Sequence, residues 1–336
     1  MRRSIRSAGG IAALAGLAAW MLAGASPSAR AQGAAKRKYR DTGEYNIFSQ
    51  AYRDAGNPAA QIRDLETWAQ QYPDSDFKDV RTSMLAEAYS HLNPPQPAKV
   101  LEYAAQLMSK DLKTVFDDPQ EGKGQALSFL FATTVAAGAA GTSLLPNPTL
   151  EQGDLGWTAA LRLKAAAAAF FAPANKPAAT SDADWYKSRA VMDAAADHTL
   201  MMLEIYPAEA ILAKKPQVST ECRDVAEPAY RRALEEHPDQ VYVSYKLAQA
   251  LQCQQRESPE KVSLAIYEYQ RAAVLDPTLG GAFKDAAAIP AFADRAYTMI
   301  HGSAEGLDDL KQLVRQSALP PEGFRIRTAA EIANGQ

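Results

Sequence analysis

The chain has few of the residues that usually carry catalysis or hold metals. It contains two cysteines, four histidines and only 8% aromatic residues in a length of 336. No two histidines stand at the H-x-x-x-H or H-E-x-x-H spacing that places zinc ligands on one helix face. The G-x-S-x-G, phosphate-loop and dinucleotide-binding patterns are also missing. We therefore expect no metal site, no cofactor and no catalytic residues.

Several pairs of adjacent acidic residues could be imagined as acid–base groups, namely Asp117-Asp118, Glu235-Glu236 and Asp308-Asp309. Neighbouring residues on a helix point in different directions, so such pairs do not converge on one substrate. We expect them to form solvated surface.

The composition favours helices and a negative surface. Hydrophobic residues make up 47% of the chain and alanine dominates them, which suits closely packed helices better than a β-sandwich. The net charge is −3, but residues 1–31 hold four of the 36 basic residues and no acidic ones. The chain from Gln32 therefore carries 32 basic against 39 acidic residues, or −7. A chain of this charge is not expected to bind nucleic acid.

The N-terminus has the layout of a bacterial export signal. Three arginines within the first six residues precede an uncharged run over residues 7–29. Residues 29–31, Ala-Arg-Ala, fit the small-x-small rule for signal peptidase and predict cleavage before Gln32. We expect an exported protein, periplasmic or otherwise secreted, with no stable membrane span after cleavage. An uncleaved anchor is the alternative, and the sequence leaves open whether export follows the general or the twin-arginine route.

One pattern occurs twice in the C-terminal part of the chain. It has the form A-x-x-x-Y-x-x-A-x-x-x-x-P, with Ala226, Tyr230, Ala233 and Pro238 in the first copy and Ala265, Tyr269, Ala272 and Pro277 in the second. Steps of four and three residues place Ala, Tyr and Ala on one stripe of a helix, which the proline then ends. Leu247, Ala248 and Leu251 have helical spacing between the two copies. The stretch therefore predicts a helix, a turn and a helix.

This series of small, aromatic, small and proline residues resembles the second helix of the tetratricopeptide repeat (TPR), whose period is about 34 residues. The two copies lie 39 residues apart, and the surplus falls in the polar turn 254–260. The resemblance implies an all-α, TPR-like helical solenoid of stacked antiparallel helix pairs. It divides the chain into a signal peptide (1–31), a disordered lead-in (32–44), N-terminal TPR-like repeats (45–112), an irregular helical middle segment (113–218), further TPR-like repeats (219–301), and a C-terminal capping helix and tail (302–336).

The middle segment includes twenty uncharged residues in a row, 126–145. This length formally permits a transmembrane helix. The run is rich in alanine, glycine, serine and threonine, however, which makes membrane insertion marginal. We expect a buried helix that packs closely on both sides.

The two cysteines are placed so that they can meet. Cys222 precedes one second helix, and Cys253 lies near the end of the following first helix. In a stack of helices that alternate in direction, those two ends face the same side, and an exported protein meets an oxidising compartment. We expect a structural disulfide that contributes roughly 3.5 kcal/mol in the chain-entropy model. Two unrelated buried thiols are the alternative.

In the TPR fold, first-helix residues that are not used for stacking line a concave groove where partner peptides lie. By this resemblance the best repeat presents Tyr242, Tyr245, Gln249 and Gln252 to the groove. Tyrosine rings give contact area at low entropy cost and amides pair with backbone groups, which suits a protein or extended peptide as partner. The corresponding faces nearer the N-terminus present Asn46, Gln50 and Arg53, and then Ser83, Glu87 and Ser90. An ordinary polar face without a ligand is the alternative.

The expected function is that of a non-enzymatic scaffold or adaptor for protein–protein interaction in the bacterial cell envelope. Two alternatives stay open. One is a constitutive structural subunit of an envelope assembly or secretion machine. The other is an enzyme or small-ligand receptor built from the middle segment, which would need polar groups converging around Trp157 and Trp185. The sequence makes no prediction of the partner's identity, the pathway or the oligomeric state.

Overall fold

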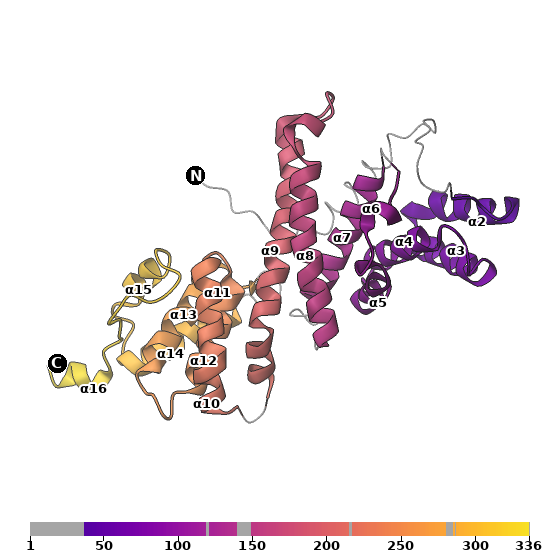
Figure 1. The fold of residues 1–336 in the computed structure, drawn as a ribbon. Helices are drawn as coiled ribbons and strands as arrows, with labels where there is room; N and C mark the ends of the chain where they lie inside the picture. The colour runs from indigo at the N-terminus through magenta and orange to yellow at the C-terminus, as the bar shows by residue number, and fades with distance from the viewer. Residues whose placement is uncertain are drawn as a thin grey trace. The chain divides into compact units, whose positions relative to one another are not determined.

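The structure is a computed structural model that describes residues 37–118, 121–139, 149–214, 217–279, 285 and 287–335. The predicted signal peptide (1–31), its cleavage site and residues 32–36 of the predicted lead-in lie outside these ranges. The described residues form helices and connecting turns with no β-strand among them, which confirms the all-α prediction (Figure 1). They divide into an N-terminal unit, up to Leu203, and a C-terminal unit, from Glu204.

The N-terminal unit begins with four helices, each packed on the next in chain order. They are α2 (Thr42–Arg53), α3 (Pro58–Gln71), α4 (Lys78–Ser90) and α5 (Pro97–Met108), with the 3₁₀ turn η2 (Asp54–Gly56) between the first two. The Asp41 and Asn57 side chains accept first-turn N–H groups at the starts of α2 and α3, and Pro58 pre-sets the backbone at the first position of α3. On α3, Leu65 and Trp68 are fully buried and anchor the core between these helices.

One short helix, a turn and three longer helices complete the described part of this unit. They are α6 (Leu112–Val115), α7 (Gly122–Gly138), α8 (Leu150–Phe170), the turn η4 (Pro173–Asn175) and the first part of α9 (Asp182–Ala213). Helix α7 carries most of the uncharged run 126–145. A Cβ on Gly138 would collide with Thr199 of α9, and a Cβ on Gly156 of α8 would collide with Ala137. The small residues of this run therefore serve close helix packing, as expected for a buried helix. Within the described residues, no helix combines the length and apolarity needed to cross a bilayer.

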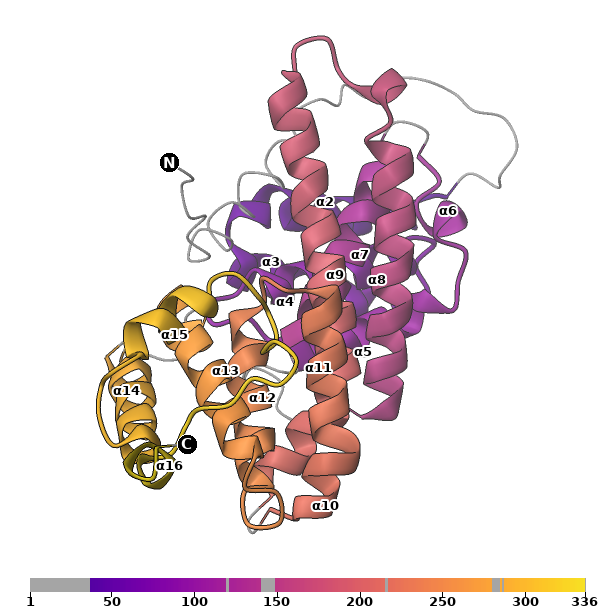
Figure 2. The ribbon, with the colours of Figure 1, turned by 90° about the vertical axis from the view of Figure 1, so that its left-hand side faces the viewer.

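The C-terminal unit contains the last part of α9 and a further series of helices (Figure 2). These are α10 (Ser219–Glu221), the π-helical turn η5 (Cys222–Ala226), α11 (Glu227–Glu236), α12 (Val241–Cys253), α13 (Lys261–Leu275), α14 (Ala288–His301), α15 (Leu307–Leu313) and α16 (Ala329–Ala333). From α11 to α14 each helix packs on the next, and α15 returns to α13.

The first copy of the repeated sequence pattern runs from the end of η5 through α11, and the second copy lies on α13. The alanine and tyrosine positions of both copies are buried, and each helix ends two residues before its proline, Pro238 or Pro277. Helix α12 packs on both of these helices. The helix, turn and helix predicted for this stretch, with its buried stripe, are therefore found.

The predicted disordered lead-in needs correction where the structure describes it. The Tyr39 ring stacks on Phe77 with 4.4 Å between ring centroids and lies 5.4 Å from Phe48. The Arg37 guanidinium donates a hydrogen bond to the Val115 carbonyl at 2.9 Å. The basic composition of this segment suggested disorder, but one aromatic anchor and one arginine tie it to residues far along the chain.

Candidate functional site

Tyr242, the first of the four residues predicted to line a groove on α12, is held inside the C-terminal unit. Its hydroxyl donates to the Glu209 carboxylate of α9 at 3.1 Å. The same carboxylate accepts a hydrogen bond from the Tyr230 hydroxyl and pairs with the Lys246 ammonium, both at 2.7 Å. Burial and the Glu209 charge raise the pKa of Tyr242, which keeps its hydroxyl protonated. Tyr242 therefore joins α12 to α9 and is not free to meet a partner.

The other three predicted groove residues are also engaged. The Tyr245 ring packs edge-on against Tyr269, with 5.6 Å between centroids, and Tyr245 interacts with Gln249. The Tyr269 hydroxyl donates to the Gln252 side-chain oxygen at 2.8 Å, although Gln252 remains exposed. Partner binding by these four residues stays a prediction, and the structure shows a further role for helix α12. Its polar face is used to hold α9, α12 and α13 together, because those helices supply matching donors and acceptors.

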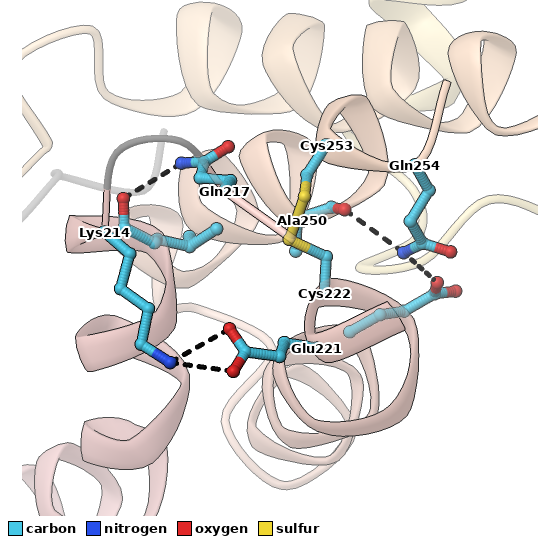
Figure 3. The surroundings of a disulfide bond; sticks show 9 residues. Lys214, Gln217, Glu221, Cys222, Ala250, Cys253 and Gln254 are labelled. Carbon is cyan, nitrogen blue, oxygen red and sulfur yellow. Dashed lines mark hydrogen bonds and ion pairs between the residues drawn. A yellow bond between two sulfur atoms is a disulfide. The ribbon is translucent and has the colours of Figure 1, made fainter. Parts of the chain in front are cut away.

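The predicted disulfide is present in the C-terminal unit. The sulfurs of Cys222, on η5, and Cys253, at the end of α12, lie 2.12 Å apart with the Cα atoms separated by 6.3 Å. Figure 3 shows the bond flanked by the Lys214–Glu221 ion pair at 2.8 Å and by Gln254. The bond joins two helical segments, and its neighbours Lys214, Glu221 and Gln254 bond to other groups of the same unit, which is a structural arrangement.

Trp157 and Trp185, around which the middle segment could have formed a ligand site, have different surroundings. The Trp185 ring is buried against Phe170 and Phe171, and its N–H donates to the Phe171 carbonyl at 3.3 Å. Trp157 is 45% exposed on α8. These positions give no support to a site shared by the two indoles.

A cavity of about 380 Å³ opens in the N-terminal unit. This volume falls in the range of about 300–1,000 Å³ that is usual for ligand sites. Its walls come from the start of the described chain, from α2 and α4, from the segment after α6, and from the beginning of α7. The packed helices form only part of the cavity lining. The segments 37–39 and 115–118 supply the rest.

One wall of the cavity is aromatic. Tyr39 lies between Phe48 and Phe77, as described above, and the Tyr52 ring lies 6.1 Å from Phe48. Phe116 adds a buried ring from the opposite segment. Such a wall offers apolar contact area and the negative faces of several π systems.

Polar groups without protein partners lie deep in the cavity. Burial raises the pKa of the Glu87 carboxyl to about 8, so it is largely neutral at pH 7. No side chain or backbone group of the described residues pairs with that carboxyl. Gln61 is only 8% exposed, and its amide also lacks a hydrogen-bond partner within the described part of the chain. Nearby, the Ser83 hydroxyl donates to the Val80 carbonyl at 2.7 Å.

Charged groups surround the cavity mouth. Arg37 pairs with Asp117 at 3.5 Å, and the Asp118 carboxylate accepts the Glu121 N–H at 2.7 Å, just before α7 begins. His91 lies at the mouth, where enough of its ring is enclosed to lower its pKa. The acidic pair 117–118, expected to be plain solvated surface, therefore contributes to the rim of the cavity.

Sequence reasoning found part of this site. The face of α4 predicted for partner contact includes Ser83 and Glu87, and both line the cavity. On α2, by contrast, Gln50 and Arg53 bond to each other at 2.7 Å and lie outside it. The aromatic wall was missed. For the polar residues of the cavity, the only local signal was the spacing of Glu87 and His91, which are four residues apart and thus on one helix face.

Comparison of the chain with protein-family models, with curated proteins and with solved structures finds no significant match in any of the three.

Proposed function

We propose that this protein is a non-enzymatic adaptor that binds an extended segment of a partner protein through the N-terminal cavity. The observation that carries the proposal is the presence of two enclosed polar groups without partners, the Glu87 carboxyl and the Gln61 amide, beside an aromatic wall. An unpaired buried polar group costs roughly 1–3 kcal/mol. A partner that supplies the missing hydrogen bonds would offset that cost on binding.

The position of the cavity supports a peptide as the ligand. Phe48 and Tyr52 come from α2, and Ser83 and Glu87 come from α4. In a TPR-like arrangement α2 and α4 are first helices, and first helices face the partner groove. We therefore include in this proposal a TPR-like stacking of the pairs α2–α3 and α4–α5.

We place this activity in the bacterial cell envelope. The disulfide between Cys222 and Cys253 suits an oxidising compartment. The arginines and apolar run of residues 1–31 have the layout of an export signal. The disulfide would stabilise the C-terminal unit of such an adaptor in that compartment, while the N-terminal cavity stays open to partners.

Site-specific photocross-linking in native envelopes tests the proposal. A photoreactive benzoylphenylalanine replaces Ala55, which lines the cavity, or Ala105, an exposed alanine of α5 that does not. We expect the Ala55 variant to form an adduct with one extended peptide segment, identified by mass spectrometry of the linked peptide. The Ala105 variant should form none with that segment. Equal labelling from both positions, or no adduct from Ala55, contradicts peptide binding in the cavity.

A further inference from the structure

We propose that the cavity takes a long cationic side chain, lysine or arginine, from the bound segment, with its charge held at the Glu87 carboxyl. This inference rests on the proposed function, since it names the residue type that the partner must present. It is carried by the charge balance, the aromatic wall and the unpaired acceptors of the cavity.

The fixed charges of the cavity favour a cation. Arg37 is its one basic side chain that stays charged at neutral pH, and it is already paired with Asp117. Asp118 adds a second carboxylate to the lining and accepts the Glu121 N–H just before α7. The Glu121 side chain has no cationic partner in the described residues and remains as an excess negative charge. With one cation against three carboxylates, the cavity is negative by two charges before Glu87 ionises.

The aromatic wall suits the shape of such a side chain. Lysine and arginine have apolar stems that pack along hydrophobic surface while the charged end reaches a polar site. Tyr39, Phe48 and Tyr52 provide that surface, and a cation near their faces gains cation–π attraction. Glu87 and Gln61 line the same cavity, and the Gln61 amide oxygen and the ionised Glu87 carboxylate can accept hydrogen bonds from an ammonium or guanidinium group.

Binding of a cation must release a proton from this site. The empty cavity holds Glu87 as a neutral carboxylic acid; when the cation enters, the O–H proton leaves to solvent and the carboxylate remains to pair with the cation. The titratable and charged groups that share the cavity are Arg37, Tyr39, Tyr52, His91, Asp117, Asp118 and Glu121. Of these, His91 has a pKa lowered by burial, which favours its neutral form. Affinity should therefore rise about tenfold from pH 6 to pH 7, which is the limiting slope for one released proton.

Fluorescence anisotropy with labelled peptide libraries tests this inference. The purified full chain is titrated into capped hexapeptide pools whose central residue is fixed as lysine, arginine, norleucine or glutamate and whose other positions are random. n-Butylamine serves as a competing free amine. The variant is Glu87→Gln, which keeps the side-chain shape, and the matched control is Glu102→Gln on α5, outside the cavity.

We expect the lysine or arginine pool to bind at least tenfold more tightly than the norleucine pool, with the pH slope given above. Glu87→Gln should remove both the preference and the slope, and Glu102→Gln should keep them. If all pools bind equally well and Glu87→Gln changes nothing, the cationic side chain is refuted while peptide binding stands. If n-butylamine binds but no peptide pool does, the proposed adaptor function fails, and with it a partner residue as the occupant.

Discussion

Two glutamates, one in each unit, share the same electrostatic perturbation and differ in access. Burial raises the pKa of both Glu87 and Glu268 to about 8. Glu268 is completely enclosed on α13, beside Ser244 and Arg271, so no ligand can reach it. Glu87 faces a cavity of about 380 Å³. A raised pKa by itself therefore marks burial, and only the opening next to the group makes it a candidate for binding.

The two units also differ in how far their polar groups are occupied by contacts within the unit. In the C-terminal unit the polar faces of α9, α11 and α12 are joined by networks around Glu209 and Glu227, and a disulfide links η5 to α12. In the N-terminal unit the aromatic and acidic groups of the cavity remain available. The strongest repeat pattern thus lies where hydrogen-bond networks and the disulfide join neighbouring helices. The more irregular region holds the candidate site.

Loss of the disulfide should have the largest effect and should be confined to one unit. The loop between Cys222 and Cys253 spans 31 residues, and closing it stabilises the folded chain by about 3.5 kcal/mol in the chain-entropy model. All described tryptophans, Trp68, Trp157 and Trp185, belong to the N-terminal unit. In the Cys222→Ala, Cys253→Ala variant, urea unfolding followed by circular dichroism should gain an early phase. The urea midpoint of the tryptophan fluorescence transition should not change. An equal shift of the fluorescence and circular dichroism midpoints would show that the two units unfold together.

Removal of the Glu227 carboxylate should be nearly as costly. This group is 5% exposed and accepts hydrogen bonds from Arg231, Gln254 and Lys261, each at 2.8 Å. Glu227→Ala leaves those donors unpaired, and we expect a loss of about 3 kcal/mol in unfolding free energy. Glu227→Gln, which keeps the volume and one acceptor, should lose less.

The pH dependence of this effect has a defined sign. Hydrogen bonds and the Arg231 charge outweigh burial and lower the pKa of Glu227. Its contribution is therefore present above the unfolded pKa of about 4.3 and is lost as the pH falls through the lower folded value. The difference between wild type and Glu227→Ala should shrink in acid. A difference that stays constant down to pH 2 would contradict the assignment.

Glu87→Gln should act in the opposite direction. The folded pKa of Glu87 is raised from 4.5 to about 8, so above pH 4.5 the unfolded chain has lost a proton that the folded chain keeps. The Glu87 contribution to wild-type stability should therefore decline as the pH rises from about 4.5 to 8, and the amide should remove that part of the decline. We expect the variant to be more stable at pH 8 by on the order of 1–2 kcal/mol, because water in the cavity screens part of the burial cost.

Glu268→Gln sharpens the comparison between the two acids. This variant should also flatten the stability–pH profile, since burial raises the pKa of the wild-type Glu268 carboxyl to about 8. Binding of the lysine-containing peptide pool should be unaffected, because the side chain is sealed. A loss of peptide binding equal to that of Glu87→Gln would break the distinction between enclosed and accessible acids.

The exposed pair Lys99–Glu102 on α5 should have the smallest effect. Its side chains are about half exposed, with the charged atoms 2.8 Å apart. Exposed pairs of this kind contribute little because water and salt screen them. Lys99→Ala should leave the urea midpoint unchanged by both fluorescence and circular dichroism, and a clear shift would mean that α5 makes contacts beyond those described.

Several features of this fold were accessible from local patterns. The buried stripe of α11 and α13, the helix ends before Pro238 and Pro277, and the close packing of α7 all follow from spacing and residue size. Ser83 and Glu87, predicted to lie on one face of a helix, both line the cavity. The rest of the cavity depends on long-range contacts, such as the bond from Arg37 to the Val115 carbonyl 78 residues away, for which no local periodicity exists.

The sequence by itself determined that the chain is helical, where its best helices begin and end, and that its two cysteines can pair. These properties depend on intervals of a few residues or on the alternation of neighbouring helices. Tertiary structure decided which polar helix face stays open. The Tyr242 hydroxyl is occupied because Glu209, 33 residues earlier, lies against it, whereas the Glu87 carboxyl lines a cavity and has no partner among the described residues. The availability of a polar group depends on what packs against it, and that is a property of the folded chain.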